Sequence, residues 1–291
     1  MRWRRKFVTR SEVQVTAPMK TGRRWTACLI APRTVMELIA VNSLRKVYGT
    51  RDGPVIALQD IHFAIEKGEF VAIVGPSGCG KSTLLKILIG LIPASQGEAR
   101  LSGTAIAGPR RDIGVVFQSP VLFPWRTVLD NVLLPVDVQR LGRDKLKARA
   151  MNLLSLVGLQ GFEKRYPQEL SGGMQQRAAM VRALIHDPTM LFMDEPFGAL
   201  DAMTREQMNL QLQQVWLERK ETVLFITHSI PEAVFLADRV LVMTPRPGHI
   251  VDDVAVDLAR PRSLDVMTTP DFGRHVKRIR DYFKTAGDFA A

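Results

Sequence analysis

Residues 69–82 read EFVAIVGPSGCGKS, an apolar run that leads into a glycine-rich turn. The run from Glu69 to Gly75 is nearly continuously apolar, which is typical of a β-strand buried on both faces. The turn from Gly75 to Ser82 matches the pattern G-x-x-x-x-G-K-[ST], and a helical stretch follows it. The sequence therefore predicts a strand, a phosphate-binding loop and a helix in direct succession.

The glycines of this loop let the backbone bend so that successive N–H groups point at phosphate oxygens, and the next helix start adds a positive dipole end. We expect Lys81 to contact the β and γ phosphates of ATP and Ser82 to bind Mg²⁺. A strand-to-helix turn without a ligand is the alternative. The expected nucleotide contacts in the loop are Gly75, Pro76, Ser77, Gly78, Cys79, Gly80, Lys81, Ser82 and Thr83.

The stretch from Met190 to Glu195 is a second candidate element, an apolar strand that ends in two carboxylates. A carboxylate at the end of a buried strand needs a cation or a donor to offset its desolvation. A Mg²⁺ ion shared with Ser82 would meet that need for Asp194. Glu195 can hold a water for in-line attack on the γ phosphate. The alternative is that both acids open the turn before Pro196.

Further strands and helices are predicted along the chain, where ordered patterning begins near Met36. Apolar runs at residues 222–227 and 240–243 also predict buried strands. Because buried strands alternate with helical stretches, the sequence indicates an α/β fold with parallel strands at its centre.

The helices are marked by apolar spacing and by start signals. Helical spacing is found in residues 144–157, with Gly158 where a helix would stop, and again in residues 208–216. Residues 229–232 have the spacing of a capping box. Residues 269–270, Thr-Pro, open an amphipathic helix whose outer face is basic, and we interpret that face as solvated rather than as a binding surface.

The charge of the chain is concentrated at one end. Of the formal net charge of +11, residues 1–35 carry +8 and the remaining residues +3. A nearly balanced body argues against a basic groove for nucleic acid along the whole chain. The basic segment lacks the apolar centre of a secretory signal; a disordered arm, a non-native start or an organellar transit peptide remain open.

Composition excludes other classes of protein. With 46% hydrophobic and 24% charged residues the chain is globular, and no uncharged apolar run approaches the ~20 residues of a membrane span. The two cysteines, Cys28 and Cys79, form no disulfide framework, and a reducing compartment is the simpler assumption.

The motifs around the phosphate loop resemble those of the ABC ATPases. Residues 170–177, LSGGMQQR, resemble the family's signature motif, and the resemblance covers about residues 37–250. It implies a P-loop NTPase (RecA-like) core with a parallel-rich sheet, an antiparallel β subdomain and a small helical subdomain at about residues 119–170. The ATPase domain would then span residues 36–265, between the basic extension 1–35 and a C-terminal amphipathic helix in residues 266–291.

The resemblance implies roles for single residues outside the loop. Gln118 corresponds to the Q-loop glutamine at the metal and the reaction centre. His228 corresponds to the switch histidine that bonds the γ phosphate and the attacking water. Tyr48 corresponds to the aromatic side chain that stacks on adenine, for which Phe63 and Phe70 are alternatives.

The resemblance also implies a partner. Ser171, Gly172 and Gly173 of the signature would face the γ phosphate bound by a second subunit, together with Asp201 of the D-loop. One phosphate loop and one signature in the chain therefore imply a homodimer with two ATP molecules at its interface. ATP binding would close this dimer and hydrolysis would open it, so a single copy is expected to hydrolyse ATP poorly.

The spacing of the motifs bears on the kind of ABC ATPase. The 52 residues between Gln118 and Ser171 are too few for the long coiled-coil arms of the branch that acts on DNA. The resemblance instead implies the energy-coupling subunit of a transporter, peripheral at the cytoplasmic face of the cell membrane. Its partners would be two membrane-spanning permease subunits and, indirectly, an extracytoplasmic solute-binding protein, with no nucleic acid. A soluble ABC ATPase acting on nucleic acid and a catalytically silent regulatory subunit remain alternatives.

Residues 123–128, and residues 245–250 with residues 258–262 beyond them, resemble segments of importers for nitrate, alkanesulfonates, taurine and similar small solutes. The resemblance implies that Phe123 and Trp125 border the groove that receives a short helix of a membrane subunit. We expect these aromatics to form an exposed patch, and packing of Trp125 into the core is the alternative. The solute itself is not encoded in these motifs.

Overall fold

The computed structural model describes residues 37–285, which belong to one compact unit. The basic extension lies outside the described residues, together with the expectation of disorder made for it, and so do residues 286–291. None of the helices between residues 37 and 285 has the length and apolar character that a membrane span requires.

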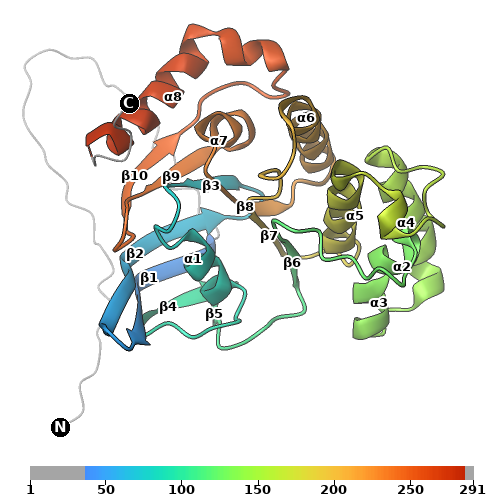
Figure 1. Ribbon diagram of the computed structural model, residues 1–291, viewed down its shortest axis with the longest axis horizontal. Helices are drawn as coiled ribbons and strands as arrows, with labels where there is room; N and C mark the ends of the chain where they lie inside the picture. The colour runs from blue at the N-terminus through green and yellow to red at the C-terminus, as the bar shows by residue number, and fades with distance from the viewer. Residues whose placement is uncertain (1–36, 286–291) are drawn as a thin grey trace, which may run out of the picture. The chain divides into compact units, whose positions relative to one another are not determined.

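A six-stranded sheet forms the centre of this unit (Figure 1). In spatial order its strands are β10 (Ile250–Ala255), β9 (Arg239–Met243), β3 (Phe70–Val74), β8 (Thr222–Thr227), β7 (Met190–Asp194) and β6 (Ile113–Val116). The pairs from β9 to β6 are parallel, and the edge strand β10 is antiparallel to β9. The predicted α/β fold with a parallel-rich sheet is confirmed.

A second, antiparallel sheet covers one face of the first. Its spatial order is β2-β1-β4-β5, and its strands are β1 (Glu37–Thr50), β2 (Gly53–Glu66), β4 (Gln96–Leu101) and β5 (Thr104–Ala105). The two long strands β1 and β2 form a hairpin in which Tyr48 pairs with Val55. The antiparallel β subdomain is therefore present as expected.

The helices lie on both faces of the central sheet (Figure 1). They are α1 (Lys81–Leu88), α2 (Val128–Val132), α3 (Leu134–Gln139), α4 (Arg143–Leu156), α5 (Gly172–Leu184), α6 (Ala202–Arg219), α7 (Ile230–Leu236) and α8 (Pro270–Thr285), with 3₁₀ turns at Pro167–Glu169 and Leu264–Thr268. Helix α1 packs between the two sheets, whereas α6, α7 and α8 lie on the opposite face of the central sheet.

Strand β3 shows why its sequence is apolar without a break. Phe70, Ala72 and Val74 belong to the core shared with α5 to α8. Val71 and Ile73 belong to the other core, which α1 and the antiparallel sheet complete. Successive side chains of a strand point to opposite faces, so a strand covered on both faces is apolar at every position. This strand and helix α1 hold the loop 75–80 between them.

The segment between β6 and α5 is helical, as expected for a small helical subdomain. The helix predicted for residues 144–157 is α4, and helices α2 and α3 precede it. These two were missed because they span only five and six residues, too few to show a helical period.

The start of α7 differs from the prediction. Ser229 Oγ accepts a hydrogen bond from the Glu232 N–H at 3.4 Å, which is half of a capping box. The Glu232 carboxylate, however, accepts from the Thr227 hydroxyl at 2.8 Å instead of the Ser229 N–H. The predicted reciprocal box is therefore wrong, because a buried neighbour supplies the better donor.

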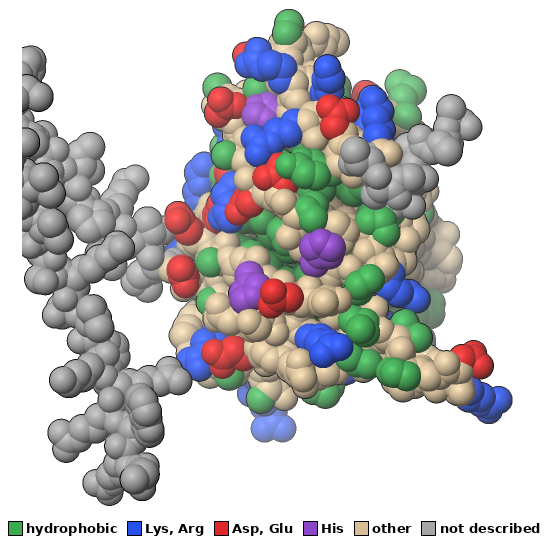
Figure 2. All heavy atoms as spheres, turned by 90° about the vertical axis from the view of Figure 1, so that its left-hand side faces the viewer, with side chains coloured by type: hydrophobic (Ala, Val, Ile, Leu, Met, Phe, Trp, Pro, Cys, Tyr) green, Lys and Arg blue, Asp and Glu red, His purple; other side chains and the backbone are tan. Residues whose placement is uncertain are grey.

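Helix α8 follows its predicted pattern. Phe272, Ile279 and Phe283 are buried against the core. On its outer side Arg278 bonds Asp252, and Arg274 pairs with Asp271. Figure 2 faces this side of the molecule and shows Lys and Arg side chains interleaved with Asp and Glu. The basic face is thus a solvated, ion-paired face, as the sequence indicated.

Candidate functional site

A cavity of about 480 Å³ opens beside the loop that joins β3 to α1. The cavity is bounded on one side by the end of the β1–β2 hairpin and on the other by the loop. Its lining residues are Tyr48, Thr50, Val55, Ala57, Ser77, Gly78, Gly80, Lys81, Ser82, Thr83, Glu195 and Arg246. The cavity therefore lies where the sequence predicts a phosphate site.

Two glycines of the loop are required by its close packing. A Cβ on Gly75 would lie 2.7 Å from the Met243 carbonyl oxygen, and one on Gly80 would lie 2.9 Å from that of Ala57. Gly80 also has a φ of 107°, in the left-handed region. Gly80 is the N-cap of α1 and offers no side chain to its first N–H groups, which leaves them available to an anion.

Lys81 points back over the loop. Its Nζ donates to the carbonyl oxygens of Gly75 and Pro76 at 2.8 and 3.0 Å, and the side chain is almost wholly buried. Glu195 Oε1 lies 3.8 Å from the same nitrogen. A buried ammonium that is held mainly by carbonyl dipoles can attract an anion entering the cavity.

The loop residues that do not line the cavity form its underside. Gly75 and Pro76 hold Lys81 through their carbonyl groups, and the side chain of Cys79 is buried. Burial raises the pKa of the Cys79 thiol. Of the nine loop residues predicted to contact a nucleotide, six therefore line the cavity: Ser77, Gly78, Gly80, Lys81, Ser82 and Thr83.

Ser82 and Asp194 lie next to each other in a way that fits a divalent cation. Burial raises the pKa of Asp194, and a hydrogen bond from the Ser82 side chain opposes that shift. Asp194 Oδ1 is buried and has no hydrogen-bond partner among residues 37–285. A hydroxyl beside a carboxylate oxygen that lacks a partner is an oxygen donor set that suits Mg²⁺.

Glu195 and His228 meet at the ends of two neighbouring parallel strands. Glu195 follows β7 and His228 follows β8, and His228 Nδ1 lies 3.0 Å from Glu195 Oε2. Glu195 has a φ of 44°, an uncommon conformation for a residue other than glycine. Its N–H bonds the Ile226 carbonyl oxygen at 2.8 Å. The carboxylate is thereby held between His228 and Lys81.

Gln118 joins this edge of the sheet from the third strand. It follows β6, which pairs with β7, and its side chain is exposed. A Cβ on Gly198 would lie 3.5 Å from Gln118 Nε2 and 3.4 Å from the Glu195 carbonyl oxygen. The carboxyl ends of β6, β7 and β8 thus bring together Gln118, Glu195 and His228, which are far apart in the sequence.

A buried carboxylate, Glu232, holds the residues on either side of His228 through hydrogen bonds. Glu232 Oε2 accepts a hydrogen bond from the Thr227 hydroxyl at 2.8 Å. The Thr227 oxygen in turn accepts one from the Ser229 N–H at 3.0 Å. Arg205 Nε lies 3.4 Å from Glu232 Oε1. Burial raises the pKa of Glu232, and the bond from Thr227 opposes the shift. Sequence reasoning assigned Glu232 to a cap and missed this support, which depends on a partner in α6.

The signature segment lies outside the cavity. Ser171 is the exposed N-cap of α5, and its Oγ accepts from the Met174 N–H at 3.3 Å. Gly172 is exposed, and a Cβ on Gly173 would lie 2.9 Å from Thr204 Cγ2. The Ser-Gly-Gly segment therefore presents an open helix start at the surface.

Asp201 occupies the corresponding position of the next helix. It is the N-cap of α6, and its Oδ1 accepts from the Thr204 N–H at 3.0 Å. The Thr204 hydroxyl lowers the pKa of this carboxyl. Thr204 links the two helix starts, because it is also the residue nearest to Gly173.

Tyr48 is the aromatic side chain of the cavity. It is 38% exposed, and its hydroxyl lies 3.5 Å from Thr83 Oγ1. Of its two alternatives, Phe70 is fully buried beside Trp216 and Phe63 packs against the core below the antiparallel sheet. Neither phenylalanine lines the cavity, so Tyr48 is the one of these three aromatic side chains that does.

Four lining residues were not predicted: Thr50, Val55, Ala57 and Arg246. The first three belong to the β1–β2 hairpin, in which Val55 pairs with Tyr48. A prediction of this hairpin register would have placed them beside Tyr48. Arg246 comes from the loop between β9 and β10, 168 residues from the carbonyl of Gly78 that it contacts. No sequence pattern near either residue predicts the contact between Arg246 and Gly78.

Comparison with known proteins agrees with this geometry. The sequence model of the family described as "ABC transporter" matches residues 58–198. The taurine import ATP-binding protein TauB of Burkholderia pseudomallei is 46% identical over 225 residues, 77% of this chain and 86% of that protein. The aliphatic sulfonates import ATP-binding protein SsuB of Bacillus cereus is 41% identical over 250 residues, 86% of this chain and 97% of that protein.

A solved structure, the dimeric bacterial ABC transporter cassette MJ0796, superimposes with a TM-score of 0.68 at 32% identity, covering 76% of this chain and all of that one. A second structure of the same cassette, in a post-hydrolysis state with ADP and Pi bound, gives a TM-score of 0.66 at 31% identity with the same coverage.

Proposed function

The chain belongs to the ABC transporter family as an ATP-hydrolysing, energy-coupling subunit, and we propose that its transporter imports a small solute such as nitrate, a sulfonate or taurine. The meeting of Lys81, Glu195 and His228 beside the cavity supports ATP hydrolysis, and the similarity to the sulfonate and taurine import proteins carries the proposal of import. Nucleotide binding follows from the family and from the ADP-bound cassette. The similarity to import proteins leaves the nucleic-acid alternative without support.

The side chains around the cavity divide the work of hydrolysis between them. Lys81 and the N–H groups at the start of α1 hold the phosphates, and the Glu195 carboxylate takes a proton from the attacking water. His228 keeps that carboxylate in place and bonds the γ phosphate, while Gln118 lies next to the same turn. Mg²⁺ held by Ser82 and Asp194 would neutralise charge that develops on the phosphates.

The open signature supports a homodimer. In one chain, Ser171 and Gly172 are exposed and do not line the cavity. The N–H groups at the start of α5 suit a phosphate, and a second copy can bring its own signature to that position. The dimeric cassette of similar structure supports such an assembly, in which each ATP lies between the loop of one copy and the signature of the other.

An aromatic patch supports contact with membrane subunits. Trp125 is 71% exposed and stacks on Phe123 with ring centroids 5.0 Å apart. Trp125 is therefore exposed as expected and the alternative of a core Trp125 is wrong, whereas Phe123 is half-buried beneath it. An exposed tryptophan that stacks on a half-buried phenylalanine is typical of a surface that a partner covers.

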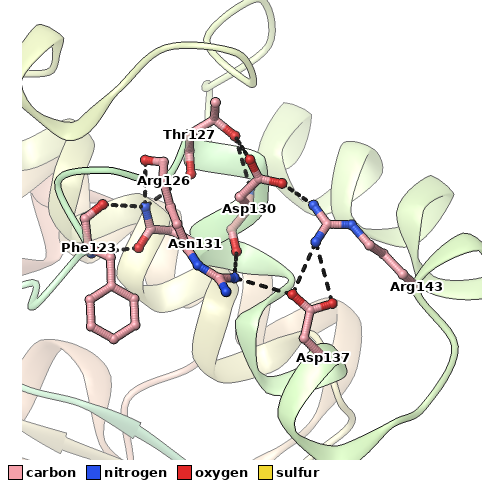
Figure 3. A network of polar contacts seen from close by, with 7 residues as sticks. All are labelled: Phe123, Arg126, Thr127, Asp130, Asn131, Asp137 and Arg143. Carbon is pink, nitrogen blue, oxygen red and sulfur yellow. Dashed lines mark hydrogen bonds and ion pairs between the residues drawn. The ribbon is translucent and has the colours of Figure 1, made fainter.

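The segment that carries this patch is held from beneath (Figure 3). Asn131 is fully buried, and its Oδ1 accepts from the Phe123 N–H at 2.7 Å. Its Nδ2 donates to the carbonyl oxygens of Phe123, Arg126 and Thr127 at 3.0–3.1 Å. One buried amide thus fixes the backbone from 123 to 127, so that the aromatic rings are presented in one orientation. A permease helix at the cytoplasmic face of the membrane would dock there.

A Trp125→Ala variant is expected to fold normally and to lose its membrane partners. An exposed side chain contributes little to the folded state, whereas an exposed tryptophan in an interface is often essential for binding. We expect retention on membranes that contain the permeases to weaken at least about tenfold, with a melting temperature unchanged. Leu91→Ala, which removes a side chain that is 55% exposed on the turn after α1, is the matched control. Normal assembly with a lowered melting temperature would show that Trp125 supports the fold instead.

The proposed function is tested by reconstitution with candidate permeases and a solute-binding protein in vesicles. We expect ATP turnover to rise when taurine, an alkanesulfonate or nitrate is supplied with its binding protein. A Lys81→Ala variant should lose this turnover by about 100-fold or more, because a buried cation at the phosphates is removed. Turnover that is unaffected by Lys81→Ala would refute the site, and turnover that no solute stimulates would refute the importer.

A further inference from the structure

The loop between β9 and β10 is built against the nucleotide cavity. It carries the sequence PRPGHI at residues 245–250, which the proposed function leaves without a role. Gly248 N–H donates to the Ala57 carbonyl oxygen at 3.1 Å, and the Gln59 N–H donates to the Gly248 carbonyl oxygen at 2.9 Å. These bonds tie the loop to β2, one wall of the cavity.

Gly248 also packs closely against the backbone of the phosphate loop. It is buried, and a Cβ there would lie 2.0 Å from the carbonyl oxygen of Cys79 and 2.4 Å from Met243 Cε. Only glycine fits such an approach between two backbones. The loop is therefore in direct contact with the segment that surrounds the phosphates.

A threonine braces the loop internally. Thr244 Oγ1 lies 2.8 Å from His249 Nδ1 and accepts from the His249 N–H at 3.1 Å. The same hydroxyl lies 3.4 Å from the Pro247 carbonyl oxygen. The loop is thus held by hydrogen bonds at Thr244, Gly248 and His249, and Arg246 lies at its tip.

Arg246 enters the cavity with an unpaired charge. Its side chain lines the cavity beside Ser77 and Gly78, and its Nη2 donates to the Gly78 carbonyl oxygen at 3.5 Å. Within residues 37–285 no Asp or Glu pairs with this guanidinium, whereas Arg239 on the preceding strand β9 is paired with Glu69. A guanidinium that faces a cavity without a carboxylate is free to bind an anion.

We propose that Arg246 is a nucleotide-binding residue that donates from its guanidinium to a phosphate oxygen of ATP or ADP. The inference rests on the proposed function, which places the nucleotide in this cavity. Arg246 adds a second cation to the cavity from the loop between β9 and β10, while Lys81 lies within the phosphate loop itself. A planar guanidinium with several donors matches the oxygens of a phosphate, and such charge-assisted bonds are about twice as strong as neutral ones.

The test is the dissociation constant of the full chain for ATP and for ADP, measured by titration calorimetry. Arg246→Gln keeps a polar side chain and removes the charge, and we expect it to weaken both nucleotides about tenfold. Arg246→Lys should retain part of the affinity, because it keeps the charge without the planar fork. The matched control is Arg51→Gln, an exposed arginine at the end of the β1–β2 hairpin that does not line the cavity; its affinity should equal that of the wild type.

A second variant tests whether the loop positions the arginine. Thr244→Val removes the hydroxyl brace with little change in shape, and it should weaken ATP binding in the wild type but not in the Arg246→Gln background. Equal losses in both backgrounds would show that Thr244 does not act through Arg246.

The outcomes separate this inference from the function on which it rests. If Lys81→Ala weakens ATP binding and Arg246→Gln does not, the role of Arg246 is overturned and the site stands. If neither variant changes the affinity, the nucleotide does not bind in this cavity, and both proposals fall.

Discussion

A Glu195→Gln variant is expected to bind ATP as tightly as the wild type and to turn it over at least about 100-fold more slowly, the usual contribution of a general base. Glu195 Oε2 lies 3.0 Å from His228 Nδ1, and Oε1 lies 3.8 Å from Lys81 Nζ. A glutamine has the same shape and can keep a hydrogen bond to the histidine, but its amide cannot accept a proton from water. Binding and turnover should therefore separate.

The measurement is ATP turnover in membranes with the partner subunits, together with the ATP dissociation constant and the mass of the complex. Because the γ phosphate would stay intact, the variant should accumulate as a closed dimer when ATP is present. Glu218→Gln, an exposed carboxylate near the end of α6, is the control and should behave as the wild type. Undiminished turnover would refute the assignment of Glu195 as the base.

An Asp194→Asn variant is expected to be more stable than the wild type when no metal is present. It should also be stabilised less than the wild type by ATP with Mg²⁺. Burial raises the pKa of Asp194 from its ordinary value of 3.8, and Oδ1 lacks a hydrogen-bond partner among the described residues. A carboxyl whose pKa is raised by folding favours the folded state fully below its unfolded pKa. That contribution is lost as the pH rises through the folded pKa. Above that folded pKa the wild type bears a carboxylate charge at a buried oxygen, which asparagine does not.

The check is a series of thermal melts in a chelator between pH 4 and pH 8. At pH 7 the variant should melt about 2–4 °C above the wild type, the shift that ~1 kcal/mol produces in a chain of this size. The difference should shrink as the pH falls through the raised pKa of Asp194, because protonation removes the charge from the wild type. Addition of ATP with Mg²⁺ should stabilise the wild type and have less effect on the variant.

Asp52→Asn, an exposed carboxylate at the end of the β1–β2 hairpin, is the control and should show no such gain. A variant that melts below the wild type in the chelator would show that the Asp194 carboxylate stabilises the folded state even without a metal. ATP turnover should fall in the variant, because the metal would lose its only protein carboxylate in the proposed site.

The strands and the loop could be predicted from the sequence because the patterns that mark them lie within a few consecutive residues, although the contacts behind those patterns are tertiary. The unbroken apolar run of β3 reflects burial of both faces, and Gly75 and Gly80 lie where another side chain would collide with a neighbouring backbone. Helices α4 and α8 could be predicted from the helical spacing of their apolar residues. The five-residue helix α2 did not, and Glu232 was assigned to a cap because its buried partners lie in other elements.

By itself, then, the sequence determined the strand, loop and helix around the cavity and the α/β class, since these follow from patterns within a few residues. The roles proposed for Gln118 and His228 came from the resemblance to the ABC ATPases. The tertiary structure alone decided which of those residues meet. The order β6-β7-β8 brings Gln118, Glu195 and His228 to one edge. The same folding places Arg246 against Gly78, across 168 residues of chain. Such contacts depend on how strands pair and loops pack over long separations, and no short-range pattern specifies that.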